Sequence, residues 1–388
     1  MERTLRAVFQ QHFAGYAEAH RLPLYIHRAA YWLAHCRTIA LGGHMSRCPE
    51  GHVARAWYNS CHQRSCPQCQ AIATERWVEA QKARLLACAH HHLIFTIPHE
   101  LNELWSFNRV AMARILFAAV RDTLTELLGD AKYLGARAAF ILALHTWGRS
   151  LVLHPHIHAL VADGGLGEDG AWKQPRRSHF LPARVVMMLF RGKLLAAIRG
   201  GVARSQLRLA PNQSRERLNS LLNKLGRRKW NVRLCTRYAH GAGVAAYLAR
   251  YLRGGPLKNA QLTEVDPHHI GFVYRPHGEE GERHAQQVLL RLPPDQFFAR
   301  YLAHVPPPGL QSVRTYGLYA NTQRERLDRA RAELDQTPVE TPAPLTPQAF
   351  LARFPNAAAT LLHCPRCGRA LISIPLPRYA TGPPNLLH

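Results

Sequence analysis

Acidic residues are scarce in this chain of 388 residues. It contains 25 Asp and Glu against 50 Lys and Arg, which gives a formal net charge of +25. A positive excess of this size attracts polyanions and releases their counterions on binding, so it favours nucleic acid as the partner. The alternative is a basic globular protein with no special partner. A hydrophobic content of 47% with 19% charged residues is typical of a packed chain with one large or two ordinary domains.

The chain also lacks a long apolar run. No stretch approaches the roughly 18 residues of a membrane span, and the opening Met-Glu-Arg-Thr-Leu-Arg lacks the hydrophobic core of a secretory signal. We therefore expect a cytoplasmic protein with no membrane partner. In that compartment the nine cysteines, four of them in two Cys-Pro-x-Cys pairs, are expected to be reduced metal ligands rather than disulfides, with Zn²⁺ as the ion.

Two pairs of short-spaced ligands predict a structural zinc site near the N-terminus. Cys48 and His52 form the first pair, and Cys66 and Cys69 follow after thirteen residues. Two such pairs, separated by a loop, suit the tetrahedral coordination of structural zinc. We expect these four residues to be the ligands, with Cys61 as the first substitute. Three further potential ligands lie nearby in the sequence: Cys36, His44 and His62.

A second Cys-Pro-x-Cys pair lies near the C-terminus. Cys364 and Cys367 resemble half of a zinc ribbon, but no second Cys-x2-Cys pair follows them. His363 or a ligand from elsewhere in the chain would have to complete a site. The pair is a possible second zinc site or a vestige of one.

Three histidines alternate along an apolar run between residues 151 and 162. His154, His156 and His158 therefore lie on one face of an expected strand, where threonine or valine would be ordinary. His156 and His158 can hold one divalent ion if a third ligand comes from a neighbouring element, and His145 or His154 is the candidate. The alternative is a set of histidines that only stabilise the fold.

Two tyrosines stand four residues apart in an expected helix near 243–253. This spacing places Tyr247 and Tyr251 on one face, beside the apolar stripe that other residues of the helix supply. Positive charge lies close to them in the sequence and is expected to bind phosphate. The residues concerned are Arg250, Arg253 and Lys258.

Tyrosine, metal and cations together suit phosphoryl transfer. A phenol with a pKa of about 10 is a poor nucleophile at neutral pH, so it requires nearby cations, and the phosphodiester requires a metal that orients it. Attack would leave a phosphotyrosine and a free 3′-hydroxyl, and resealing would require no ATP. The sequence contains no Gly-x4-Gly-Lys-Ser/Thr loop, in agreement with that expectation.

The order of these motifs resembles the HUH endonuclease superfamily, and specifically the two-tyrosine rolling-circle transposases of the insertion sequence 91 type. The resemblance extends over most of the chain. It includes Cys36-Arg37-Thr38, Leu41-Gly42-Gly43-His44, Tyr58 to Cys61, Cys66 to Cys69, Phe95 to Pro98, His145 to Gly148, Tyr247 to Pro256 and Val313 to Leu318.

The resemblance implies an α+β fold, with an HUH palm built on a central antiparallel sheet flanked by helices. It also implies an N-terminal helical and zinc-ribbon module that recognises DNA, and a small C-terminal tail. His156 and His158 match the metal pair, for Mg²⁺ or Mn²⁺, while Tyr247 and Tyr251 match the nucleophiles. Nicking and joining of single-stranded DNA at element ends, by a nucleoid-associated bacterial protein, is the activity implied. The oligomeric state is left open.

Composition and pattern, together with what the resemblance implies, predict four segments. These are residues 1–75 (N-terminal helices and zinc module), 76–324 (HUH nuclease domain), 325–348 (a charged, then proline-rich linker) and 349–388 (the tail with the half ribbon). Strand-like runs are expected at 91–97, twice within 138–163 with a break near 148–150, and at 230–237, 270–274 and 287–292.

Two other functional classes fit part of the pattern. A zinc-ribbon DNA-binding regulator without catalysis accounts for the charge and the cysteines, but leaves the histidine strand and the tyrosine helix unexplained. A metal-dependent hydrolase could use the His-x-His pair to activate water, but it would require a carboxylate ligand and further spaced histidines, and no convincing set is present.

Overall fold

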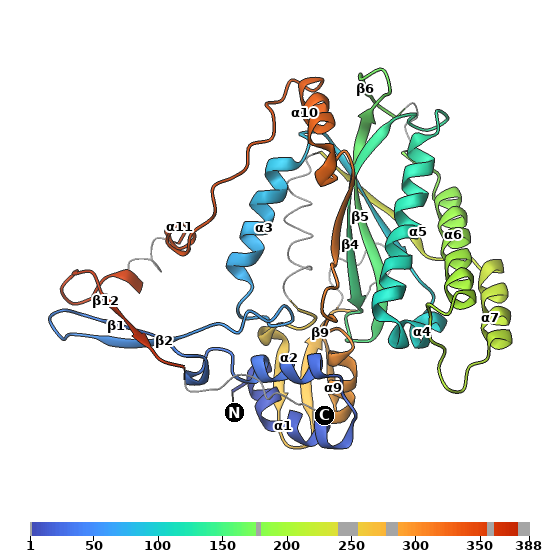
Figure 1. The fold of residues 1–388 in the computed structure, drawn as a ribbon. Coiled ribbons are helices and arrows are strands. Elements are labelled where there is room, and N and C mark those ends of the chain that lie inside the picture. The colour runs from blue at the N-terminus through green and yellow to red at the C-terminus, as the bar shows by residue number, and fades with distance from the viewer. Residues whose placement is uncertain (1, 176–179, 240–254, 277–285, 355–360, 379–388) are drawn as a thin grey trace.

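The computed structural model describes residues 2–175, 180–239, 255–276, 286–354 and 361–378. It combines helices with antiparallel sheets (Figure 1), which confirms the predicted α+β class with a central antiparallel sheet flanked by helices. The α-helices are α1 (Leu5–Ala19), α2 (Leu24–Ala34), α3 (Ala71–Arg84), α4 (Asn102–Phe107), α5 (Arg109–Gly129), α6 (Ala183–Ala203), α7 (Arg215–Arg227), α9 (Pro294–Leu302), α10 (Arg324–Ala332) and α11 (Pro347–Ala352). Within these ranges, no helix is long and apolar enough to cross a membrane.

The strands of the described residues form three separate sheets. Their bounds are β1 (Gly43–Arg47), β2 (Ala54–Tyr58), β3 (His90–Thr96), β4 (Arg137–Trp147), β5 (Leu153–Leu166), β6 (Trp172–Lys173), β7 (Val232–Tyr238), β8 (Leu262–Val265), β9 (Ile270–Tyr274), β10 (Val288–Leu292), β11 (Val313–Gly317) and β12 (Ile372–Leu376). The central sheet has the order β11-β4-β5-β3-β7, with β6 paired to β5, and the pairings are antiparallel.

The two long strands β4 and β5 form the middle of the central sheet. Most of their side chains are buried, because apolar clusters pack against both faces of these strands. The turn between them is closed by a hydrogen bond from the Gly148 amide to the Val152 carbonyl, 2.9 Å long. This turn confirms the predicted break between two strands.

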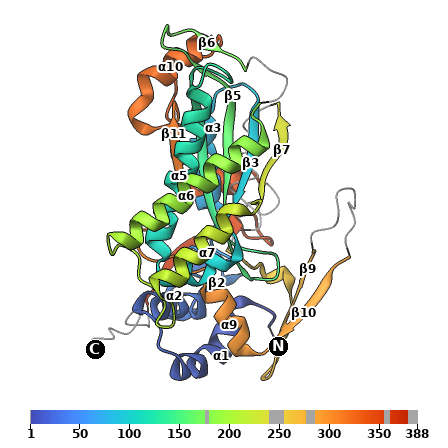
Figure 2. The ribbon, with the colours of Figure 1, turned by 90° about the vertical axis from the view of Figure 1, so that its right-hand side faces the viewer.

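One face of the central sheet packs against α5 and α6 (Figures 1 and 2). Leu142, Leu144 and Ile157 point to this face and join a large apolar cluster with Phe117 and Phe190 from the two helices. Burying an aromatic or leucine side chain of this kind contributes about 1.5–3 kcal/mol to stability. This cluster is the main core of the protein.

The opposite face of the sheet contains a second, smaller apolar cluster. Ile141 and Leu160 contact a smaller apolar cluster that includes Leu327 and Ala330 of α10. The predicted linker at 325–348 therefore differs from the structure at its start, because its first residues form a helix that packs against the sheet. This helix is mostly charged, but Leu327 and Ala330 on one of its sides are buried.

A second packed unit joins the N-terminus to residues far along the chain. The helices α1 and α2 share an apolar cluster with α9 and with the sheet of order β10-β9-β8. Phe9 contacts Phe298 with ring centroids 5.1 Å apart and Tyr301 with centroids 5.6 Å apart. The N-terminal helices therefore do not pack as a module separate from the predicted domain at 76–324.

The third sheet has the order β12-β1-β2 and projects away from the rest of the molecule (Figure 1). Its β12 comes from the C-terminal segment and pairs along all five residues with β1, from Gly43↔Leu376 to Arg47↔Ile372. The predicted tail is therefore joined to the predicted N-terminal module by a shared sheet.

A buried hydroxyl provides a test of this packing. His90 donates through Nδ1 to the Cys88 carbonyl, which leaves Nε2 to accept from the Tyr319 hydroxyl at 2.8 Å. That hydroxyl also accepts from the Leu86 amide at 3.0 Å. We predict that Tyr319→Phe lowers the free energy of unfolding by about 1–3 kcal/mol, since two buried polar groups lose their partner.

Chemical denaturation measures this difference. The control is Tyr316→Phe, which removes the hydroxyl of a half-buried tyrosine three residues earlier and should change stability by no more than about 0.5 kcal/mol. Equal stabilities of Tyr319→Phe and the wild type would contradict the assigned network.

Candidate metal centres and DNA groove

The register of β4 and β5 brings three histidines together. His145 on β4 lies directly opposite His156 on β5, and His158 lies two residues further on the same face. One ring nitrogen from each lies within 4.8 Å of the others. His154 is exposed and lies outside this group. Of the two candidates for a third ligand, the structure therefore favours His145.

Hydrogen bonds orient the His156 and His158 rings. Nδ1 of His156 lies 2.6 Å from the His154 carbonyl and must donate to it, which leaves Nε2 as a lone-pair donor. That Nε2 faces Nε2 of His158 at 3.1 Å. Nδ1 of His158 lies 2.8 Å from Nε2 of His92 on β3. His92 therefore holds the ring nitrogen of His158 that does not face His156. Hydrogen-bond partners of this kind orient metal-bound histidines in other proteins.

Burial keeps the imidazoles of His145, His158 and His92 neutral. Burial, followed by the charges of neighbouring histidines, lowers the pKa of His158 and of His145 well below the ordinary value. Burial also lowers the pKa of His92 to about 4. Neutral imidazole is the form that binds a metal, so His145 and His158 are in the form that accepts a divalent cation at neutral pH.

The predicted nucleophiles Tyr247 and Tyr251 lie outside the described residues, as do Arg250 and Arg253. Lys258 is described and is exposed, directly before the short helix Asn259–Gln261. The structure therefore describes the candidate metal ligands but not the predicted nucleophiles.

The predicted zinc ligands divide into two groups. Cys66 and Cys69 lie with Cys36 and Cys61, with the four sulfurs within 4.8 Å of one another. The sulfur of Cys61 lies 3.5 Å from that of Cys69, and the sulfur of Cys66 lies 3.6 Å from that of Cys36. Tetrahedral zinc, with Zn–S bonds of about 2.3 Å, places its sulfurs about 3.8 Å apart, so this donor set fits the ion.

Cys48 and His52 belong to the second group, with Cys364 and Cys367. The prediction of one site from Cys48, His52, Cys66 and Cys69 is therefore wrong. The hairpin of β1 and β2 carries the first pair away from the second, and each pair meets partners that are distant in sequence.

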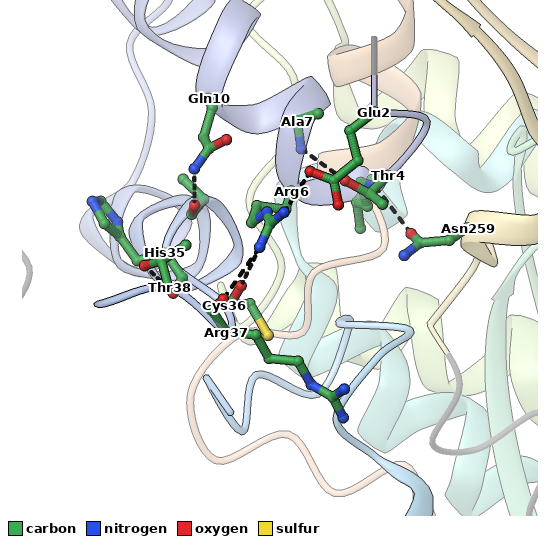
Figure 3. A network of polar contacts seen from close by, with 12 residues as sticks. Glu2, Thr4, Arg6, Ala7, Gln10, His35, Cys36, Arg37, Thr38 and Asn259 are labelled. Carbon is green, nitrogen blue, oxygen red and sulfur yellow. Dashed lines mark hydrogen bonds and ion pairs between the residues drawn. The ribbon is translucent and has the colours of Figure 1, made fainter. Parts of the chain in front are cut away.

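Hydrogen bonds from α1 hold Cys36 in place (Figure 3). Cys36 follows the end of α2, where backbone carbonyls lack helical partners. Gln10 donates to the Ala34 carbonyl at 2.8 Å, and Arg6 donates to the carbonyls of Cys36 and Arg37 at 3.5 and 3.2 Å. Sequence spacing missed Cys36 as a favoured ligand because it lies 25 residues before Cys61.

The loop from Cys61 to Cys69 contains a cation whose charge acts on the histidine centre. Its Arg64 lies close enough for its charge to add to the causes that lower the pKa of His145. Ser65 in the same loop accepts a hydrogen bond from the buried Tyr301 hydroxyl at 2.8 Å. A Cβ atom on Gly255 would lie 2.3 Å from the Ser65 carbonyl oxygen, so only glycine fits there.

A groove runs beside the edge strand β11, between that strand and α3. Its lining contains cations, aromatic rings and amides, including Arg64, Trp77, Arg121, Arg314, Tyr316 and Asn321. Cations beside aromatic rings are the combination that binds the backbone and bases of a single nucleic-acid strand. Arg64 lines this groove, and its charge also helps to lower the pKa of His145.

Comparison with known proteins identifies the family. Residues 139–326 match the family model described as "Putative transposase", and residues 8–97 match the one described as "Transposase zinc-binding domain". The protein y4qJ of Sinorhizobium fredii, described in the same words as the first model, is 32% identical over 90% of this chain and 89% of its own. The transposase for the insertion sequence element IS801 of Pseudomonas savastanoi pv. phaseolicola is 30% identical over 87% of this chain and 80% of its own.

This chain belongs to the insertion sequence 91 family of transposases. The predicted family and its N-terminal zinc-binding domain are thereby confirmed. Among solved structures, the conjugative relaxase TrwC in complex with oriT DNA matches 42% of the transposase and 72% of its own chain at 16% identity. Its TM-score of 0.22 is too low to establish a common fold.

The zinc-binding domain of the transposase contains the complete four-cysteine group, since residues 8–97 include Cys36 and Cys69. We predict that Cys36→Ser lowers the zinc content of the purified transposase by about one ion per chain, because zinc in structural sites requires four protein ligands. Mass spectrometry of the metals measures this loss.

Cys88→Ser is the matched control for Cys36→Ser. Burial raises the pKa of the Cys88 thiol to about 11, and this residue lies outside both cysteine groups, so its loss should leave the zinc content unchanged. Unchanged zinc in Cys36→Ser would refute the four-cysteine assignment.

Proposed function

We propose that this transposase nicks and joins single-stranded DNA at the ends of its insertion sequence through a phosphotyrosine intermediate. The observation that supports this most directly is the convergence of His145, His156 and His158 on one face of the central sheet. Tyr247 or Tyr251 would be the nucleophile, a role that rests on the sequence. A divalent ion, Mg²⁺ or Mn²⁺, would be held by the three histidines.

In the proposed step, the phenolic oxygen attacks the scissile phosphorus. The bond from phosphorus to the 3′ oxygen breaks, and that oxygen leaves as a 3′-hydroxyl after taking up a proton. The 5′ phosphate remains esterified to tyrosine. Attack on this ester by a second 3′-hydroxyl reverses the exchange, so strands are rejoined without an external energy source.

The bound metal would supply charge to the phosphate oxygens in the transition state. The protein's own contribution is to fix the ligands. The His154 carbonyl fixes the tautomer of His156, and His92 supports His158. Arg64 adds a cation beside the site, and the groove along β11 offers a path for a single strand.

A covalent adduct tests the proposed chemistry. The transposase is incubated with Mn²⁺ and labelled single-stranded DNA that contains an element end. It should become covalently attached to the 5′-phosphate end produced by the nick. Tyr247→Phe combined with Tyr251→Phe should remove the adduct while DNA binding persists, because only the phenolic oxygens are lost. Denaturing gel electrophoresis of the labelled DNA detects the attachment.

Two other results would contradict the phosphotyrosine mechanism. Binding without cleavage would indicate a DNA-binding regulator. Cleavage without a protein-linked product would indicate that water is the nucleophile, as in a metal-dependent hydrolase. The single variants Tyr247→Phe and Tyr251→Phe then show which tyrosine makes the first attack.

The third ligand is tested with a matched pair of histidine variants. We predict that His145→Phe raises the dissociation constant for Mn²⁺ by about 10-fold or more, whereas His154→Phe leaves it unchanged. The lower bound is the effect of losing a residue that only orients a metal ligand. Calorimetric titration of each full-length variant with Mn²⁺ measures the dissociation constant.

His92→Phe extends the same series. It keeps a ring against His158 but removes the nitrogen that orients it, so the dissociation constant for Mn²⁺ should rise by about 10–100-fold. An effect of His154→Phe larger than that of His145→Phe would show that His154 is the third ligand.

A further inference from the structure

The second group of ligands joins residues from opposite ends of the chain. Cys48 and His52 lie between β1 and β2, whereas Cys364 and Cys367 lie just before β12. The sulfur of Cys48 lies 3.8 Å from Nδ1 of His52 and 3.6 Å from the sulfur of Cys367. The sulfur of Cys364 lies 4.0 Å from the same Nδ1, across 312 residues of sequence.

These distances suit a shared metal ion better than a disulfide. A disulfide requires a sulfur–sulfur distance of about 2.05 Å, far shorter than the 3.6 Å between Cys48 and Cys367. Tetrahedral zinc, with bonds of about 2.3 Å to sulfur and 2.0–2.1 Å to nitrogen, places its ligand atoms about 3.6–3.8 Å apart. Three thiolates and one imidazole are an ordinary donor set for structural zinc.

The two ligand pairs lie in turns that are built alike. In each, the amide of the first cysteine donates to the carbonyl five residues later, from Cys48 to Val53 at 2.9 Å and from Cys364 to Arg369 at 2.8 Å. In each, a glycine with positive φ closes the turn by donating to the carbonyl of that cysteine. These glycines are Gly51, with φ +76°, and Gly368, with φ +71°.

The sheet attached to these turns has no apolar core. No described residue of β1, β2 or β12 belongs to the three apolar clusters of the protein. On β12, Ile372 is 54% exposed and Ile374 is 41% exposed. The ion pair of Arg369 with Glu50, 2.6 Å long, is exposed and therefore adds little. A small sheet without apolar burial requires a disulfide, a metal or a partner for its stability.

We propose that Cys48, His52, Cys364 and Cys367 bind a second structural Zn²⁺, which fastens the C-terminal segment to the hairpin of β1 and β2. The bound ion serves as the core of a three-stranded zinc ribbon whose third strand is β12. The zinc-binding domain at 8–97 contains only half of this site, and the second half comes from residues that follow the transposase domain. The proposal is independent of the chemistry at the histidines.

Zinc content and strand protection test the second site. The full-length wild type should contain about two zinc ions per chain, and Cys364→Ser combined with Cys367→Ser should contain about one. In the same variant, the amides of β12 should lose their protection from hydrogen exchange, because the strand is released from β1. Cys235→Ser, outside both groups, should leave the zinc content and the exchange of β12 unchanged.

A second variant separates loss of the ion from general misfolding. His52→Cys replaces one zinc ligand with another and should retain about two ions per chain. With Co²⁺ in place of zinc, it should show stronger thiolate-to-metal absorption than the wild type, since a fourth thiolate joins this site. A wild type with one zinc ion, a Cys364 and Cys367 double variant with two, or a Cys48–Cys367 disulfide in the purified protein would overturn the proposal.

Discussion

The antiparallel register of β4 and β5 is the constraint on which the candidate metal centre depends. It places His145 opposite His156, so two of the three imidazoles meet across a single strand pair. A shift of one residue in β5 would turn its histidines to the face covered by α5 and α6. Leu144 and Ile157, which alternate with the histidines, are buried in the main core and thereby hold the register. The packing of one face therefore sets the chemistry of the other.

The four-cysteine group is connected to the same centre through its loop. Between Cys61 and Cys69 the chain carries Arg64 towards His145 and places Ser65 against Tyr301 and Gly255. Gly255 stands four residues after Tyr251 in the sequence. The zinc loop thus forms part of the surroundings of the proposed active site, as well as part of the N-terminal module. Loss of zinc from this group would disturb the position of a cation beside the histidines.

Local pattern was sufficient to predict β3, β4, β5 and β7 of the central sheet, but not its edge strand β11, the short β6 or the partners of the zinc ligands. The runs at 91–97 and within 138–163 are apolar and rich in β-branched or aromatic residues, because both faces of these strands are buried along much of their length. The histidine pair could also be predicted from local pattern, since alternation along a strand places His156 and His158 on the same face. His92 was not visible, because its role depends on the pairing of β3 with β5. The helix at the start of the predicted linker was missed because only two of its residues face the core.

The error in the zinc assignment has one physical cause. Spacing identifies a turn that can present two ligands, but the choice of partner turn is made by strand pairing and packing across the whole chain. Here the β1–β2 hairpin is inserted between Cys36 and Cys61, so the ligands of the two groups alternate in the sequence. The hairpin has two strands and no apolar core, and such a hairpin is only marginally stable alone. Its turn contains two of the four ligands that zinc requires. The other two lie in the turn just before β12, which pairs with β1. The half ribbon at the C-terminus and the half ribbon at the N-terminus are thus parts of a single small fold, divided in sequence by the transposase domain.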